Sequence, residues 1–250
     1  MDFTLTDAQH DLAGLAREIL TDQVTQQRLR ELETAPDHFD RALWTDLAEA
    51  GVLAAALPVV SIGERLAGAP AAGEVLFDNR AGVRCALEHL HALGHGRIAV
   101  LRPPGSPTND RPAELFVVAE ADRLSLEVQV VTARYELREA TELASALLTA
   151  VPRPTAVFCF SDSIAYGVYA AARELDIAIP EELSVIGYDD HPISTLLSPP
   201  LTSFSWGSKR LVEVAVQMLL AAMEGDPSVR RRVVIAPELR ERGSTTPPGA

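Results

Sequence analysis

Short β-branched runs alternate with amphipathic helical runs along the chain after Pro58, and this alternation constrains the fold more than any other feature of the sequence. Strands and helices in alternation favour a parallel sheet with helices on both faces. Both faces of such strands are buried, so they read as continuous apolar runs, as TAVFCF (155–160) and LSVIGY (183–188) do. The predicted strands are residues 58–62, 74–77, 97–101, 126–131, 155–160, 183–188 and 232–236, and the predicted helices are residues 80–93, 112–123, 138–150, 163–175 and 209–223.

Residues 1–57 have a different pattern, with apolar residues at helical spacing and no alternation of period two. The first predicted helix follows Thr6, which forms the pattern of a capping box with Gln9. A second is expected over residues 25–33, and a third runs from residue 40 to about Gly51, a glycine typical of a helix C-terminus. We therefore predict an all-helical segment over residues 1–57 and an α/β domain over residues 58–250.

Composition and charge exclude several classes of protein. The chain is 47% hydrophobic and 23% charged, as in ordinary globular proteins. Its net charge is −13, and residues 1–58 carry 11 acids and 4 bases, which makes them a poor candidate for a DNA-binding surface. No apolar run is long enough for a membrane span, and the N-terminus lacks the pattern of a signal peptide, so a cytoplasmic location is expected. Cys85 and Cys159 lie in apolar patterns and are expected to be free thiols.

Polar side chains follow two of the most apolar predicted strands. Ser161 and Asp162 come directly after TAVFCF, and Asp189 and Asp190 come directly after LSVIGY. In open α/β sheets, ligands bind beyond the carboxyl ends of the strands, so these residues are candidates for a binding site. An ionised carboxylate only accepts hydrogen bonds, which suits a hydroxyl-rich ligand. The alternative is that Ser161 to Ser163 cap the next helix, whereas no helix is expected close to Asp189.

Catalytic and metal sites are not indicated by the sequence. Adjacent residues at a strand end point in opposite directions, so Asp189 and Asp190 are not expected to share a proton. His91 and His95 are four residues apart and could share a helix face, but no third ligand is nearby and Gly94 is expected to end the helix between them. There is no Gly-rich phosphate loop and no nucleophile elbow. We predict a protein that is not an enzyme and that needs neither a cofactor nor a metal ion.

Three stretches, VLFDNRAGVRCALEHLHALGHGRIAVL, PTAVFCFSDSIAYGVYAAARELDIAIPEELSVIGYDDHPISTLLSPPLTSF and PELRERGSTTPP, occur in the order and spacing of one family. Residues 58–248 resemble the sensor domain of the lactose-repressor (LacI/GalR) family of transcriptional regulators. The resemblance implies a periplasmic-binding-protein-like fold of two lobes, with a sugar or nucleoside held between them. It also implies a homodimer in which the ligand shifts the lobe angle and the operator affinity.

The resemblance assigns ligand contacts to individual residues. It implies contacts at Arg111, Ser161, Asp162, Asp189 and Trp206, where Trp206 would stack on a sugar ring. The residue-based alternatives are an ion-paired surface position for Arg111 and a core position for Trp206. Glu114 stands where the family has a glycine close after the arginine.

The resemblance is incomplete at the start of the sensor. The second lobe is expected to be complete over about residues 79–203, but the two or more βα units that begin the first lobe in the family are not found, nor are the helix-turn-helix and the hinge helix. DNA binding is therefore expected only if a separate DNA-binding domain is supplied. Residues 1–58 instead resemble the N-terminal helices of acyl-CoA dehydrogenases. A fragment of such a flavoprotein, or a non-functional gene-fusion relic, is the alternative interpretation of the chain.

Overall fold

The computed structural model describes residues 7–25, 28, 40–49, 59–63, 73–104, 113–223 and 232–249. Contacts within the chain divide it into two compact units, Met1–Pro58 and Val59–Ala250. In the first unit the structure describes two helices, α1 (Asp7–Gln23) and α3 (Arg41–Glu49). Most of the helix predicted over residues 25–33 lies outside the described residues, as do Thr6 and Gly51.

The start of α3 is fixed by a single carboxylate. Asp40 accepts a hydrogen bond from the backbone N–H of Leu43 at 2.9 Å, which is the geometry of a helix N-cap. The Arg28 guanidinium also donates to this carboxylate, with 2.7 Å between Nη2 and Oδ1. These hydrogen bonds, the one from Arg28 first, lower the pKa of Asp40 below its ordinary value.

A large sheet forms the centre of the second unit. Among the described residues it has six strands in the order β4-β3-β5-β6-β7-β9. Every neighbouring pair is parallel except β7 with β9, which is antiparallel. The strands are β3 (Arg97–Arg102), β4 (Glu127–Thr132), β5 (Ala156–Cys159), β6 (Ser184–Tyr188), β7 (Thr202–Ser205) and β9 (Glu238–Arg240).

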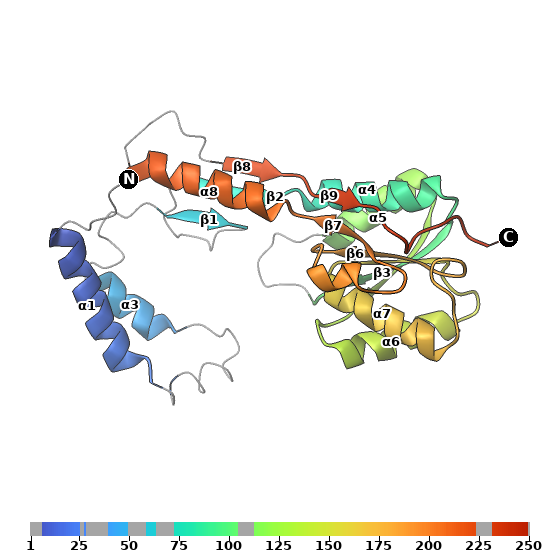
Figure 1. Ribbon diagram of the computed structural model, residues 1–250, viewed down its shortest axis with the longest axis horizontal. Coiled ribbons are helices and arrows are strands. Elements are labelled where there is room, and N and C mark those ends of the chain that lie inside the picture. Colours follow the sequence, from blue (N-terminus) through green and yellow to red (C-terminus); the bar gives the residue numbers. More distant parts are fainter. Residues whose placement is uncertain are drawn as a thin grey trace. The chain divides into compact units, whose positions relative to one another are not determined.

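Two pairs of helices cover the two faces of this sheet, as Figure 1 shows. Helices α4 (Asn79–Ala92) and α5 (Ala113–Leu124) pack on one face, around the fully buried Phe158. Helices α6 (Leu137–Thr149) and α7 (Asp162–Glu174) pack on the other face, against Val157 and Val185. The neighbouring residues Val157 and Phe158 of β5 thus pack into the cores on opposite faces of the sheet, because successive side chains of a strand alternate between faces. The predicted parallel sheet with helices on both faces is confirmed.

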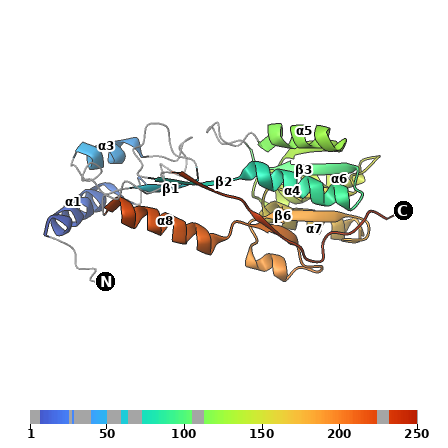
Figure 2. The ribbon, with the colours of Figure 1, turned by 90° about the horizontal axis from the view of Figure 1, so that it is seen from above.

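A second, smaller sheet contains three strands among the described residues. Its order is β1-β2-β8, all parallel, with β1 (Val60–Ile62), β2 (Gly73–Phe77) and β8 (Arg232–Ile235). Helix α8 (Ser208–Met223) runs alongside β1 and β2 in both views (Figure 2) and buries Leu211 and Met218 against Val75. None of the helices in the described residues has the length and apolar character that a membrane span requires.

The structure contains three elements that the sequence pattern did not predict. Strand β7 has the sequence TSFS and carries no continuous apolar run, and β9 is only three residues long. A 3₁₀ turn, η1 (Pro192–Thr195), begins soon after Asp189, so the expectation that no helix starts nearby was wrong. Strand β7 can be buried because its hydroxyls have partners inside the protein, with Ser203 donating to Asp162 and Thr202 accepting from the backbone N–H of Arg242. The hydrophobic pattern of the sequence does not reveal such partners.

Candidate functional site

The carboxyl ends of β5 and β6 bring two predicted site residues together. The two strands are parallel neighbours, with Phe158 opposite Ile186. Beyond their ends, the Ser161 hydroxyl donates a hydrogen bond to Asp189, with 2.9 Å between Oγ and Oδ2. The prediction that these strands release Ser161 and Asp189 at one edge is therefore confirmed.

Ser161 has two structural partners. Its Oγ accepts a hydrogen bond from the backbone N–H of Ser163 at 3.2 Å, so Ser161 is the N-cap of α7. The same oxygen donates to Asp189, and the residue is only 3% exposed. The helix-capping interpretation is correct for Ser161, and its hydroxyl also orients the carboxylate of Asp189.

Asp189 is the exposed carboxylate of this edge. Its Oδ1 accepts a hydrogen bond from the indole N–H of Trp206 at 3.3 Å, while Oδ2 accepts the bond from Ser161. The backbone φ is +119° at Asp189 and +53° at Asp190, in the region that non-glycine residues rarely adopt. A carboxylate offers about four acceptor positions, so two hydrogen bonds leave capacity for hydroxyl groups from outside.

Trp206 lies among other aromatic side chains. Its ring centroid is 4.7 Å from that of Tyr188 in an edge-on arrangement and 4.2 Å from that of Phe77 at the end of β2. The residue is half-buried and packs against the hydrophobic core, which agrees with the alternative that Trp206 is a core residue. Stacking of Trp206 on a sugar ring stays a prediction.

Asp190 has a different set of partners from Asp189. It forms an ion pair with Arg242, which comes from the segment after β9, and its backbone N–H donates to Ser203 Oγ at 3.1 Å. Arg242 also donates to the backbone carbonyl of Leu201 at 2.7 Å. The two adjacent carboxylates thus bind separate groups, as predicted from their position at a strand end.

Asp162 is buried rather than presented at the surface. It is 1% exposed, and its two oxygens accept hydrogen bonds from the Ser194 hydroxyl, the Ser203 hydroxyl and the backbone N–H of His191. Burial raises the pKa of Asp162 above its ordinary value, while these three hydrogen bonds act in the opposite direction. The predicted ligand contact at Asp162 is not supported by this geometry, because its acceptor positions face the protein interior.

Gly187 is required by the position of Asp162. A Cβ atom at Gly187 would lie 2.2 Å from Asp162 Oδ1 and 2.8 Å from Leu201 Cδ2, both closer than real side chains allow. The glycine before Tyr188 and Asp189 therefore makes room for the buried carboxylate on the neighbouring strand end.

Of the remaining predicted groups, Arg111 is outside the described residues. His95 is buried, and its ring binds Thr155, Ser184 and the carbonyl of Thr246, so it is not paired with His91 in a metal site. Within the described ranges, no group of three or more His, Cys, Asp or Glu side chains is arranged to hold a metal ion.

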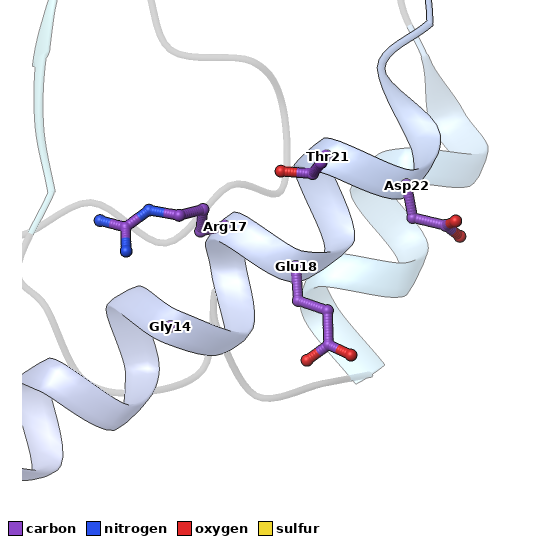
Figure 3. Close-up of a pocket in the computed structure, with 5 residues that line it drawn as sticks. All are labelled: Gly14, Arg17, Glu18, Thr21 and Asp22. Carbon is purple, nitrogen blue, oxygen red and sulfur yellow. The ribbon is translucent and has the colours of Figure 1, made fainter.

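Figure 3 shows a pocket on helix α1, in the first unit. It is an open surface hollow on a single helix rather than an enclosed cavity. Its side chains include one base and two acids, and the pocket does not contain any predicted site residue. The lining residues are Gly14, Arg17, Glu18, Thr21 and Asp22.

Sequence reasoning missed the residues from other segments that bind Asp162 and Asp190. Ser194 and Ser203 donate to Asp162, and Arg242 pairs with Asp190 from 52 residues away. No periodic pattern marks these positions, since a serine in a loop or an arginine near a chain end is ordinary. Arg242 lies in the stretch PELRERGSTTPP, whose order after the other motifs was the available signal.

Comparison with known proteins gives matches over most of the second unit. The family described as a periplasmic binding protein-like domain matches residues 87–245. The HTH-type transcriptional regulator MalR of Streptomyces coelicolor is 37% identical over 175 residues, which cover 67% of this chain and 50% of that protein. The ribose operon repressor of Escherichia coli is 32% identical over 162 residues, covering 64% and 49%. The chain thus spans about half the length of these relatives.

A solved structure is similar over almost the whole chain. The structure of a LacI transcriptional regulator from a Rhodococcus species has a TM-score of 0.71 and 28% identity, and the match covers 97% of this chain and 95% of that one. These relatives are transcriptional regulators, and they give no support to the acyl-CoA dehydrogenase resemblance of residues 1–58.

Proposed function

Because the chain belongs to the periplasmic binding protein-like family, in the branch that forms the ligand sensors of LacI/GalR-type regulators, we propose that it binds a small hydroxyl-rich effector. The predicted periplasmic-binding-protein-like domain is confirmed over residues 87–245, and the LacI/GalR resemblance is confirmed by relatives such as MalR and the ribose operon repressor. The proposed site is the edge at which β5, β6 and β7 end. Its proposed contacts are Asp189, Trp206 and, from outside the described residues, Arg111, while the buried Ser161, which was predicted as a contact, is proposed to act by orienting Asp189.

The single observation that carries this proposal is the placement of Asp189. Its carboxylate is exposed at the strand edge, and each of its oxygens is oriented by one donor, Ser161 on one side and Trp206 on the other. Held in this way, the carboxylate keeps free acceptor positions for ligand hydroxyls, and hydrogen bonds to an ionised group are the strong ones. The half-buried Trp206 supplies an apolar surface beside it, which is the combination of groups that a sugar requires.

The effector is proposed to be a sugar or a nucleoside. One relative with 32% identity is a ribose operon repressor, which supports a pentose as the first probe. The module is proposed to act in the cytoplasm as a homodimer and to influence operator binding only through a separately supplied DNA-binding domain. It is proposed not to be an enzyme, since MalR and the ribose operon repressor are regulators and Asp189 and Asp190 have different partners instead of forming a catalytic dyad.

Calorimetry with D-ribose, D-glucose and adenosine tests the proposal, together with a thermal-shift series at rising ligand concentration. Specific binding raises the melting temperature with concentration, and a ligand at 100 times its Kd stabilises by about 2.7 kcal/mol. Absence of binding by any probe would contradict the proposal and favour a non-functional relic. Absorbance of bound flavin would favour the flavoprotein interpretation.

The variant Asp189→Asn tests the site itself. Asparagine tolerates positive φ as aspartate does, so the backbone at φ +119° is retained while the charge is lost. Loss of charge-assisted hydrogen bonds worth about 1.5–3 kcal/mol predicts an affinity roughly 10- to 100-fold weaker. The matched control is Asp176→Asn, at an exposed aspartate with φ +55° at the end of α7, and it should bind as the wild type does. Equal affinity of Asp189→Asn and wild type would place the effector elsewhere.

A further inference from the structure

Asp162 connects the segments that flank the exposed carboxylate of Asp189. It occupies the first turn of α7, one residue after the N-cap Ser161. Its Oδ2 accepts hydrogen bonds from the backbone N–H of His191 at 2.8 Å and from Ser194 Oγ at 2.6 Å. Its Oδ1 accepts a hydrogen bond from Ser203 Oγ at 2.6 Å. One buried side chain is therefore bonded to the loop after β6, to η1 and to β7.

These donors lie next to the strained backbone of the site. His191 follows directly after Asp189 and Asp190, the two residues with positive φ. Ser203 receives the backbone N–H of Asp190 on the same oxygen with which it donates to Asp162. Non-glycine residues keep such backbone conformations only where surrounding contacts over-determine them, and the contacts to Asp162 do this here.

The hydrogen-bond pattern requires a group that accepts on both oxygens. The backbone N–H of His191 can only donate, so the atom opposite it must be an acceptor. An ionised Asp162 can only accept, so the hydrogen of Ser203 Oγ points to it while the same oxygen accepts from the backbone N–H of Asp190. An asparagine would place its NH₂ group either against the N–H of His191 or against Ser203 Oγ, which would then have to turn its own hydrogen away. Asparagine at this position thus keeps the volume of the side chain but breaks the pattern at one point.

We propose that Asp162 is a positioning residue of the effector site, which makes no contact with the ligand and holds the loop from Asp189 to Leu201 in the conformation that presents the Asp189 carboxylate. This inference deepens the proposed function and rests on it for the effect on ligand affinity. The effect on the loop itself depends only on the hydrogen bonds described above.

Hydrogen exchange measured on the full chain without ligand tests the effect on the loop. In Asp162→Asn, the amides of residues 190, 191 and 193–196 should exchange at least 10-fold faster than in the wild type; residue 192 is a proline and has no amide hydrogen. The NH₂ group removes the acceptor either of the His191 N–H and the Ser194 hydroxyl or of the Ser203 hydroxyl. The amides of strand β3, on the far side of β5, should exchange at the wild-type rate. Ser194→Ala removes one of the three donors to Asp162, together with the partner of the Tyr166 hydroxyl, and provides a milder variant with a smaller change in the same amides. Glu174→Gln, at an exposed acid on the same helix, is the control and should change none of them.

Calorimetry with D-ribose, D-glucose and adenosine on the same variants tests the effect on binding. For the probe that the wild type binds most tightly, Asp162→Asn should weaken affinity at least 5-fold, and Ser194→Ala less. Unchanged exchange in residues 190–196 would overturn the proposal, and so would acceleration that extends equally to β3, since this would indicate a general structural role. Faster exchange in the loop with unchanged affinity would also overturn it. If the wild type binds none of the probes, the proposed function fails, and the exchange data alone decide whether Asp162 holds the loop.

Discussion

Replacement of Gly187 by alanine is predicted to be strongly destabilising, although it adds one methyl group. The added Cβ would lie 2.2 Å from Asp162 Oδ1 and 2.8 Å from Leu201 Cδ2. Both neighbours are confined, since Leu201 is fully buried and Asp162 is held by three hydrogen bonds. Neither contact can be relieved by rotation of the end of a flexible exposed side chain.

The magnitude follows from two costs. Forcing an extra methyl group into a filled core costs about 1–3 kcal/mol. Displacement of the Asp162 carboxylate leaves a buried polar group partly unsatisfied, which costs about 1–3 kcal/mol more. The expected loss in the free energy of unfolding is therefore about 2–6 kcal/mol, a large share of the roughly 5–15 kcal/mol that stabilises a typical domain.

Urea denaturation followed by circular dichroism measures this loss, with Gly96→Ala as the matched control. Gly96 is exposed and an added Cβ there meets nothing within 4 Å, so its variant should differ from the wild type by less than about 1 kcal/mol. The double variant Gly187→Ala, Asp162→Ala should recover part of the loss relative to the sum of the single changes, because the clash with the carboxylate is removed. Additive costs in this cycle, or a loss below about 1 kcal/mol for Gly187→Ala, would refute the reasoning.

Three further changes have defined outcomes. Phe158→Ala removes a fully buried ring and should lower the free energy of unfolding by about 3–5 kcal/mol in urea titrations; a smaller loss would mean that the core collapses around the gap. Burial lowers the pKa of His95 and of His89 below the ordinary value of about 6.5, so the stability they contribute is complete above pH 6.5 and is lost as the pH falls through their native pKa values. Thermal melts between pH 7.5 and 5 should show this decline, and it should be shallower in His95→Gln. Arg242→Met removes a half-buried ion pair and a bond to a backbone carbonyl and should cost about 1–3 kcal/mol, whereas Arg240→Met, which breaks an exposed pair, should cost less than about 1 kcal/mol.

The sequence was sufficient for the elements that have a recognisable hydrophobic pattern, either a continuous apolar run or a helical period. TAVFCF and LSVIGY become the central strands β5 and β6 because a strand buried on both faces must be apolar throughout. The same reasoning placed Ser161 and Asp189 at one edge, since parallel strands end on the same side and the residues that follow them meet there. The short strand β7 escaped detection, because TSFS has neither an apolar run nor alternation.

The roles of individual polar residues were decided by tertiary structure. Asp162 and Asp189 look alike in the sequence, as acidic residues just beyond a strand end, yet one is 1% exposed and the other lies at the surface. The difference arises from Ser194 and Ser203, which reach Asp162 from 32 and 41 residues away. The hydrophobic pattern shows which residues form strands and which form helices, and so it predicted the sheet and the edge at which Ser161 and Asp189 meet. The choice between a buried acceptor and an exposed one depends on which donors the folded chain brings within hydrogen-bonding distance, and only the tertiary structure fixes that.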